Sequence, residues 1–223
     1  MADQKAVQTK KEIQKMAIKD NREYRNIPIQ NFEIRKIEDG SEESSFLVEG
    51  YASTFEPYVM FVDENGTEYK EKILPEAFKE TDFSDVVFLK DHMGTVFART
   101  RNKTLDISVD EHGLFSRTDL GKTASARAMF EEIQAGMYDQ MSFAFIVGED
   151  EYDKKEHTRT IRSIKKLFDV SAVSFPANPG TDIGVATRDY FNGVIEMERT
   201  ERFAKEEALK QARAKYDSVR KKG

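Results

Sequence analysis

The amino-acid sequence predicts an α+β protein that is mainly β: an antiparallel, barrel-like sheet with two internal helices and a helical extension at each terminus. Three observations lead to this prediction. The middle of the chain contains many short apolar or alternating segments separated by turn residues, which is typical of antiparallel strands. One segment among these strands, and the two ends of the chain, instead have apolar residues at helical spacing. The length of 223 residues suits one domain with appendages.

The first third of the chain is predicted to begin as a helix and to continue as strands. Residues 2–24 carry a sparse apolar stripe at helical spacing, and the segment Asn26-Ile27-Pro28 ends that helix. The predicted strands cover residues 29–37, 46–54, 61–63 and 69–73. The Asn65-Gly66 pair, a frequent hairpin turn, joins the last two of them. A proline at its first position predicts a short helix over 75–79.

The rest of the chain is predicted to contain further strands and two longer helices. The strands cover residues 86–89, 96–101, 105–109, 114–120, 140–147, 159–164 and 167–175. Residues 122–136 have apolar side chains on one face and end in Gly136, which favours a helix that stops there. A charged helix follows over 187–222. We therefore expect an N-terminal helical extension at 1–26, a central domain at 27–186 and a C-terminal charged helical extension at 187–223.

The net charge of −6 is distributed unevenly along the chain. Residues 26–187 carry 18 basic and 30 acidic side chains, whereas residues 1–25 and residues 188–223 each have a net charge of +3. Enzymes that act on nucleic acids more often place a basic stripe on the folded body, so the acidic body argues against DNA or RNA as a substrate. The basic ends are explained either as ordinary solvated helix faces or as contacts for nucleic acid or an acidic partner.

The composition also limits the chemistry and the location. The chain has no cysteine and three histidines, which excludes disulfides, thiolate metal sites, cysteine nucleophiles and a histidine-rich metal centre. No His-Glu-x-x-His spacing is present, so a metallohydrolase is poorly supported, and we expect neither a metal nor a cofactor. No apolar stretch reaches the ~20 residues that span a bilayer, and the N-terminus lacks an apolar signal-peptide core. We expect a soluble protein in a reducing compartment.

Two polar residues stand out because their neighbours are apolar. Ser142 lies between Met141 and Phe143 in a predicted strand, where an unpaired buried hydroxyl costs roughly 1–3 kcal/mol. Asp169 lies in a predicted core strand, where its carboxylate needs a cation or a hydrogen-bond donor. A histidine ring N–H is one such donor. The alternative explanation for Ser142 is a hydroxyl bonded to a neighbouring backbone carbonyl.

His92 is the histidine best suited to general-base catalysis. It ends an apolar strand, whereas His112 and His157 lie in charged hairpin turns that we expect to be exposed. A capped strand end is the alternative explanation for His92. Together Ser142, His92 and Asp169 provide a nucleophile, a base and an orienting acid, although their spacing does not show that they meet in space.

Six sequence blocks occur in order between residues 29 and 184. They are VEGYASTF at 48–55, EKILPEAF at 71–78, FLKDH at 88–92, DEHGL at 110–114, QAG at 134–136 with MSFAF at 141–145, and DVSAV at 169–173 with PANP at 176–179. Together they resemble the prohead maturation proteases of tailed bacteriophages, a family of serine proteases related to the herpesvirus capsid-assembly protease (assemblin). The resemblance implies a sheet of the herpesvirus-assembly-protease type.

The resemblance assigns a role to each of the three polar residues. The family's nucleophile corresponds to Ser142, its general base to His92 and its acid to Asp169. The chain departs from the family in having Asp91 where an Asn often precedes the histidine, and Ala98-Arg99-Thr100 where a Gly-Arg-Thr run is frequent. The herpesvirus relatives use a second histidine as the third member, but the turn contexts of the two other histidines in this chain favour Asp169.

By resemblance, the chain is expected to be a serine endopeptidase that cleaves a scaffold protein, or the scaffolding segment of the major capsid protein, inside the procapsid in the host cytoplasm. It is also expected to self-associate and to cleave itself, trimming off the terminal helices. Membranes and specific nucleic acids are not expected partners. The alternative is a non-catalytic internal scaffold protein with the same fold, which need not keep three polar groups in apolar strands.

Overall fold

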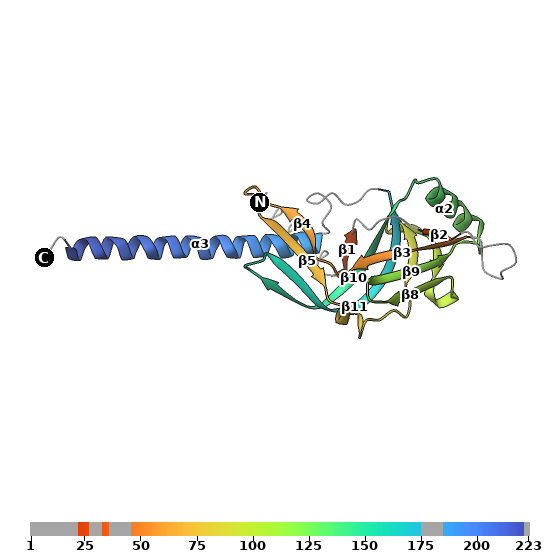
Figure 1. Ribbon diagram of the computed structural model, residues 1–223, viewed down its shortest axis with the longest axis horizontal. Helices are drawn as coiled ribbons and strands as arrows, with labels where there is room; N and C mark the ends of the chain where they lie inside the picture. The colour runs from red at the N-terminus through yellow and green to blue at the C-terminus, as the bar shows by residue number, and fades with distance from the viewer. Residues whose placement is uncertain (1–21, 27–32, 36–45, 175–184, 221–223) are drawn as a thin grey trace, which may run out of the picture. The chain divides into compact units, whose positions relative to one another are not determined.

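The computed structural model describes residues 22–26, 33–35, 46–174 and 185–220 of the chain. They belong to two units, divided between Gly184 and Val185 (Figure 1). The first unit contains all the described strands, and the second contains the helix α3 (Val185–Arg220). None of the described helices combines the length and the apolar character needed to cross a membrane.

The first unit is built on a seven-stranded mixed sheet. Five strands lie in the order β1 (Arg22–Asn26), β10 (Gln140–Asp153), β11 (Thr158–Val173), β5 (Glu68–Ile73) and β4 (Tyr58–Val62). The other two are β6 (Val87–Lys90), which pairs with β11, and β7 (Met93–Arg99), which pairs with β6. Strands β5 and β6 run parallel to the two ends of β11, and the remaining pairs are antiparallel.

A second sheet has four strands and is antiparallel throughout. Its order is β2 (Glu33–Arg35), β3 (Leu47–Thr54), β9 (Gly113–Asp119) and β8 (Leu105–Val109). The helical elements of this unit are η1 (Pro75–Phe78), η2 (Thr100–Asn102) and α2 (Ala124–Gln134). At the start of β9 a Cβ atom on Gly113 would lie 1.9 Å from the Ser53 carbonyl oxygen, so only glycine fits this close approach of β9 to β3.

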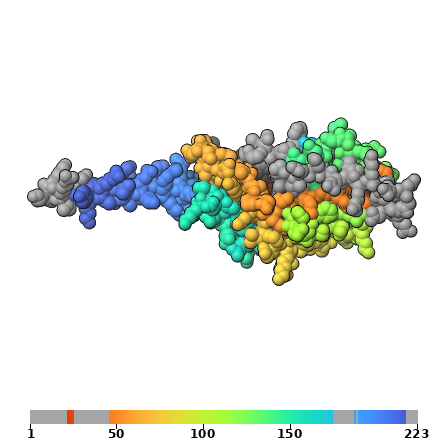
Figure 2. Space-filling model, in the orientation of Figure 1, coloured from red at the N-terminus to blue at the C-terminus, as the bar shows by residue number. Residues whose placement is uncertain are grey.

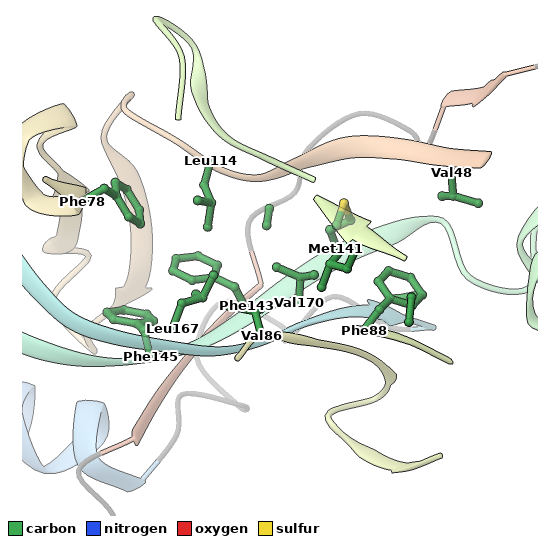
Figure 3. Close-up of a cluster of buried hydrophobic side chains, with 14 of the residues drawn as sticks. Val48, Phe78, Val86, Phe88, Leu114, Met141, Phe143, Phe145, Leu167 and Val170 are labelled. Atoms are coloured by element: carbon green, nitrogen blue, oxygen red, sulfur yellow. The ribbon is translucent and has the colours of Figure 1, made fainter. Parts of the chain in front are cut away.

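Side chains of both sheets form one hydrophobic core (Figure 3). Phe143 and Phe145 of β10 are fully buried, and their rings stack with centroids 4.8 Å apart. They belong to a cluster with Val48, Phe78, Val86, Phe88, Leu114, Met141, Leu167 and Val170. Because side chains alternate across a strand, Ser142 points to the face of β10 opposite Phe143. The core therefore fixes the face on which β10 presents Ser142.

Helix α2 leads the chain into β10. Its N-cap residue Thr123 accepts a hydrogen bond from the Ala126 N–H (3.1 Å), and its buried face includes Met129 and Phe130. Gly136 follows the helix with a φ of +74°, the left-handed conformation that ends helices and favours glycine. The predicted helix in this region is thus confirmed, with its stop at Gly136.

The mainly β class predicted from the sequence is confirmed, whereas the barrel-like type of sheet is not confirmed. The sheets are one mixed and one antiparallel, and the described strands do not close into a barrel. The strands predicted at 159–164 and 167–175 form one continuous strand, β11, as far as residue 173. The parallel pairs join segments that are distant along the chain, and local patterns carry no signal for such pairing.

The predicted terminal helices have different outcomes. The C-terminal helix is confirmed as α3. Residues 2–21 of the predicted N-terminal helix lie outside the described residues, and its last part is wrong because Arg22–Asn26 form strand β1. The strand predicted at 29–37 is described only at Glu33–Arg35, where it is confirmed. The division into three domains stays a prediction.

At one end of the first unit, the β4–β5 and β10–β11 hairpins lie close together (Figure 2). They border a groove of about 840 Å³, whose lining includes Lys70, Lys72, Lys154 and Lys155. None of the three candidate catalytic residues lines this groove. Those residues lie together elsewhere, at the junction of β1, β6, β10 and β11.

Candidate active site

Ser142 and Asp169 lie on neighbouring strands in the buried part of the mixed sheet. Strands β10 and β11 are antiparallel, with Ser142 opposite Ser171 and Ala144 opposite Asp169. Ser142 is fully buried, and Asp169 is 2% exposed. Side chains two residues apart on a strand share a face, so Asp169 and Ser171 point to the same side of β11. The strand pairing therefore brings a hydroxyl and a carboxylate to one face of the sheet.

His92 occupies a two-residue turn between β6 and β7. Asp91 and His92 have φ angles of +48° and +58°, the left-handed values that a type I′ turn requires at both central positions. The Asp91 N–H donates to the Ala172 carbonyl (3.0 Å), and the Asp91 Oδ1 atom accepts from the Ser174 N–H (3.3 Å). Because β6 runs parallel to the end of β11 that carries Asp169, this turn holds the imidazole beside that strand.

The imidazole of His92 lies between the other two side chains. Its Nδ1 atom is 2.6 Å from Asp169 Oδ1, and its Nε2 atom is 2.5 Å from Ser142 Oγ. When Nδ1 carries a proton and donates it to the carboxylate, Nε2 accepts the serine hydroxyl proton. The His92 side chain is 15% exposed, so the protein shields most of the ring from solvent. The structure thus brings together the three residues singled out in the sequence.

Ser171 is a further member of this hydrogen-bonded group that the sequence reasoning missed. Its hydroxyl donates to Asp169 Oδ1 (2.8 Å), the same oxygen that contacts His92. The spacing of two polar residues on one face of an apolar strand was the available signal. A buried carboxylate needs more than one hydrogen bond, so Ser171 helps to fix the orientation of Asp169.

Strand β1 covers the serine, which the sequence did not reveal. It pairs antiparallel with β10, with Asn26 opposite Ser142. The Ser142 hydroxyl lies within donating distance (2.9 Å) of the Arg25 backbone carbonyl, and the Tyr24 ring meets the His92 ring edge-on with centroids 4.8 Å apart. The single hydroxyl proton therefore has two acceptors, one on the imidazole and one on the backbone of β1.

A buried cluster of charged side chains anchors β1 beside the site. The Arg25 guanidinium binds Glu71 of β5 through Nε (2.5 Å) and Nη2 (2.7 Å). Glu23 accepts hydrogen bonds from Arg159 of β11 on both carboxylate oxygens (2.8 and 3.0 Å) and from Arg25 Nη2 (2.5 Å). Tyr58 of β4 donates to Glu71. Charges from three strands thus compensate one another in the interior, as buried charges must.

Protonation equilibria in this cluster are shifted. Burial raises the pKa of Glu23, but the charges and hydrogen bonds of Arg25 and Arg159 outweigh burial and lower that pKa from 4.5 to about 2. Burial and the neighbouring Glu71 carboxylate raise the pKa of Tyr58 well above its ordinary value. At neutral pH, Glu23 is therefore ionised and Tyr58 keeps the proton that it donates.

The two remaining histidines lie in other hairpin turns. His112, between β8 and β9, is exposed as predicted. His157, between β10 and β11, is half-buried beside the Tyr69 ring and the Tyr152 hydroxyl, which corrects the prediction that it is exposed. Within the described ranges, no group of three or more His, Cys, Asp or Glu side chains is placed to hold a metal ion. His92 is the histidine that contacts the candidate nucleophile.

Comparison with known proteins identifies the family. A family model described as caudovirus prohead serine protease matches residues 30–194. The prohead protease of Enterobacteria phage HK97 is 29% identical over 157 residues, which cover 66% of this chain and 62% of that protein. The alignment thus spans less than two thirds of the relative's length. No solved structure matches the chain significantly. Because the family match covers most of the chain and includes all three candidate residues, the chain belongs to the caudovirus prohead serine protease family.

Proposed function

We propose that the protein is a serine endopeptidase in which Ser142 is the nucleophile, His92 is the general base and acid, and Asp169 orients the imidazole. One observation carries the proposal: His92 Nε2 lies 2.5 Å from Ser142 Oγ while Nδ1 lies 2.6 Å from Asp169 Oδ1. With the proton on Nδ1, this double contact leaves Nε2 free to take the serine proton, as peptide-bond hydrolysis by a serine requires. Membership of a serine protease family supports the same reaction.

The reaction follows from these contacts. Ser142 Oγ attacks the carbonyl carbon of the substrate while His92 Nε2 takes the hydroxyl proton, and the Asp169 carboxylate stabilises the imidazolium that forms. His92 then returns the proton to the leaving amine, and an acyl-enzyme remains on Ser142. A water molecule that loses a proton to the same nitrogen hydrolyses the ester and regenerates the serine.

The proposed substrates are a scaffold protein or the scaffolding segment of the major capsid protein, and the chain itself, inside the procapsid in the host cell. The HK97 relative is a prohead protease, which supports a substrate from the prohead. Helix α3 is exposed over residues 201–216 and rich in charge, which suits assembly with other chains. The chain is therefore proposed to enter the procapsid with the proteins that it cleaves.

Co-expression with the capsid protein of the same phage tests the proposal. The wild-type chain is expected to convert the capsid protein or its scaffold into defined fragments, identified by mass spectrometry. Ser142→Ala is expected to leave them at full length, because it removes the nucleophile and keeps a small side chain in the strand. The matched control is Ser84→Ala, at an exposed position, which should cleave as the wild type does.

A non-catalytic scaffold protein with the same fold predicts a different result. The capsid protein would then stay at full length with the wild type and with both variants, while procapsids would still assemble. That outcome would overturn the peptidase proposal.

A further inference from the structure

On the basis of the peptidase activity proposed above, we propose that β1 is a bound substrate segment and that the chain cleaves itself between Arg25 and Asn26. The same site would then prefer substrates that carry an acidic residue, any residue and an arginine directly before the cleaved bond. Three features carry the inference: the strand pairing of β1, the contact of its backbone with Ser142, and the buried charges that hold Glu23 and Arg25.

Strand β1 lies where a peptide must lie to reach the nucleophile. Among the described strands it lies at the edge of the mixed sheet, and all five of its residues pair with β10, from Arg22 opposite Ile146 to Asn26 opposite Ser142. When an extended peptide adds to a sheet edge, backbone pairing provides affinity and side-chain pockets provide specificity. The strand that receives β1 is the one that carries Ser142, so a substrate on this edge presents its backbone to the serine.

The Arg25 carbonyl is the peptide group of β1 that is held at the serine. Ser142 Oγ lies 2.9 Å from the Arg25 carbonyl oxygen and 2.5 Å from His92 Nε2. Attack requires Ser142 Oγ to move from this hydrogen bond onto the carbonyl carbon next to that oxygen, while His92 Nε2 stays within hydrogen-bond reach of the proton that it takes. Ser142 is fully buried with β1 in place. The contact therefore points to the Arg25–Asn26 bond as the one that Ser142 cleaves.

The Arg25 side chain fills a pocket built by other strands. Glu71, itself fully buried, binds the guanidinium through two N–H groups, and Tyr58 donates to the same carboxylate. The Phe145 ring centroid lies 5.3 Å from the guanidinium carbon. The planar fork of arginine matches a carboxylate in this way, and lysine cannot reproduce both bonds. The pocket therefore selects arginine directly before the cleaved bond.

A second pocket receives Glu23, which lies two residues earlier on the same face of β1. Arg159 donates to both of its carboxylate oxygens (2.8 and 3.0 Å) and is fixed from the other side by Asp150, 2.5 Å from Arg159 Nε. Glu23 of the segment thus binds the cation Arg159, and Arg25 binds the Glu71 carboxylate. A segment with the two charges exchanged would place like charges together in the interior, which a buried site strongly disfavours.

The self-cleavage step balances with one water molecule. The Ser142 Oγ–C bond to the Arg25 carbonyl carbon forms while the hydroxyl proton moves to His92 Nε2. The bond from that carbon to Asn26 N breaks, and the proton passes to the new amino group. Water then adds to the Arg25 acyl carbon and breaks its bond to Ser142 Oγ. A proton of this water passes through His92 to Oγ and restores the hydroxyl. The products are a carboxylate at Arg25 and an amine at Asn26.

A second segment of the same pattern gives an internal comparison. Glu33-Ile34-Arg35 forms β2, which pairs with β3 in the other sheet. The bond after Arg35 is therefore not presented to Ser142 in the same chain. We expect the bond after Arg35 to stay intact under conditions in which the bond after Arg25 is cut.

Intact-mass spectrometry of the purified full chain tests the cleavage site. Incubated wild type is expected to give two fragments, residues 1–25 and 26–223, whereas Ser142→Ala stays at full length. Arg25→Ala is expected to slow this cleavage by about 100-fold or more, because Glu71 loses two charge-assisted bonds. Arg22→Ala is the matched control in the same strand: its guanidinium lies 3.8 Å from the Phe168 ring centroid, and its loss is expected to change the rate by about threefold at most.

Removal of Arg25 from a buried cluster can also destabilise the chain, so peptides provide a second test. Peptides that copy residues 19–30, with single replacements, are offered to wild-type chain that has already been incubated. The rate constant kcat/KM is expected to fall by about 100-fold or more for Arg25→Ala and by about 10-fold or more for Glu23→Ala, with Arg22→Ala within about threefold of the parent peptide. Equal rates on all four peptides would overturn the proposed substrate preference.

The outcomes separate this inference from the proposed function. If Ser142-dependent cleavage of the capsid protein occurs while the Arg25–Asn26 bond stays uncut, the inference is wrong and the peptidase proposal stands. If neither the capsid protein nor the chain is cut in a Ser142-dependent way, the peptidase proposal is wrong, and the inference falls with it.

Discussion

The Oδ1 atom of Asp169 accepts two hydrogen bonds, one from the His92 ring and one from the Ser171 hydroxyl. With both bonds made, the carboxylate has one orientation, and the imidazole that it binds has one as well. Asp169 contacts His92, the proposed base, directly, whereas Ser171 contacts Asp169. Ser171 is therefore a positioning residue, and its removal should weaken catalysis without abolishing it.

Ser171→Ala tests this role. The lost hydrogen bond to a charged group is worth about 1.5–3 kcal/mol, so kcat is expected to fall by about 10- to 150-fold while KM stays unchanged. The measurement is steady-state cleavage of a peptide substrate, with Ser108→Ala at an exposed position of β8 as the control. An unchanged kcat in Ser171→Ala would show that the carboxylate holds its orientation without this hydroxyl.

At the scale of elements, the turn between β6 and β7 determines where His92, the proposed base, lies. Asp91→Asn is expected to keep both activity and stability, because Asn accepts left-handed φ angles and can still bond the Ser174 N–H. Asp91→Val is expected to lose about 1–2 kcal/mol and most activity, because a β-branched residue is strained at a φ of +48°. Thermal unfolding midpoints and kcat of the two variants provide the measurement. Similar values for both would contradict the proposed dependence on turn geometry.

The docking of β1 is expected to depend on pH through Glu23. Its pKa in the folded chain, about 2, lies below the ordinary value of 4.5, so its ionisation stabilises the fold above pH 4.5, and this contribution is lost as the pH falls towards 2. In a Ser142→Ala background, which keeps the chain intact, Glu23→Gln lacks this contribution at every pH. The two thermal unfolding midpoints should therefore differ most above pH 4.5 and approach each other towards pH 2. A constant difference over this range would contradict the assignment.

Local patterns predicted most elements of the fold, because hairpins and the helix α2 depend on neighbouring residues. They failed for β1, because the charged residues Glu23 and Arg25 do not indicate a buried strand. Both are buried because they bind Arg159 and Glu71, which lie far away in the sequence. The continuity of β11 and its parallel pairs were missed for the same reason. In the candidate site, apolar neighbours in the sequence identified Ser142. That β1 lies beside this serine depends on a strand pairing, which the spacing of residues in the sequence does not reveal.

At the scale of the whole molecule, the C-terminal part of the chain differs from the central part in net charge and in solvent exposure. Residues 26–187 have a net charge of −12, and residues 188–223 have a net charge of +3. Helix α3 carries Phe203, Leu209 and Tyr216 as exposed apolar residues on an otherwise charged surface. These three apolar residues lie beyond residue 194, where the family match ends. The end of α3 therefore suits contact with other chains better than catalysis.

Removal of residues 198–223 tests this division of roles. Ser142-dependent peptide cleavage is expected to stay within about twofold of the full chain, because residues 201–216 are exposed and their loss uncovers no core. Incorporation into procapsids, measured by sedimentation after co-expression with the capsid protein, is expected to drop strongly. A full-length chain with Phe203, Leu209 and Tyr216 changed to serine is the matched comparison. Normal incorporation of both variants would place the assembly contact elsewhere.

Under the proposed self-cleavage, the position of β1 beside Ser142 also sets the order of events. An occupant that belongs to the same chain has an effective concentration on the order of millimolar, which dilution does not lower. The first turnover of each molecule is then unimolecular, and its rate does not depend on how many copies are present. Later turnovers on other chains are bimolecular and accelerate where substrates crowd together. Each copy would thus cut its own β1, in a first-order step, before it acts on its neighbours.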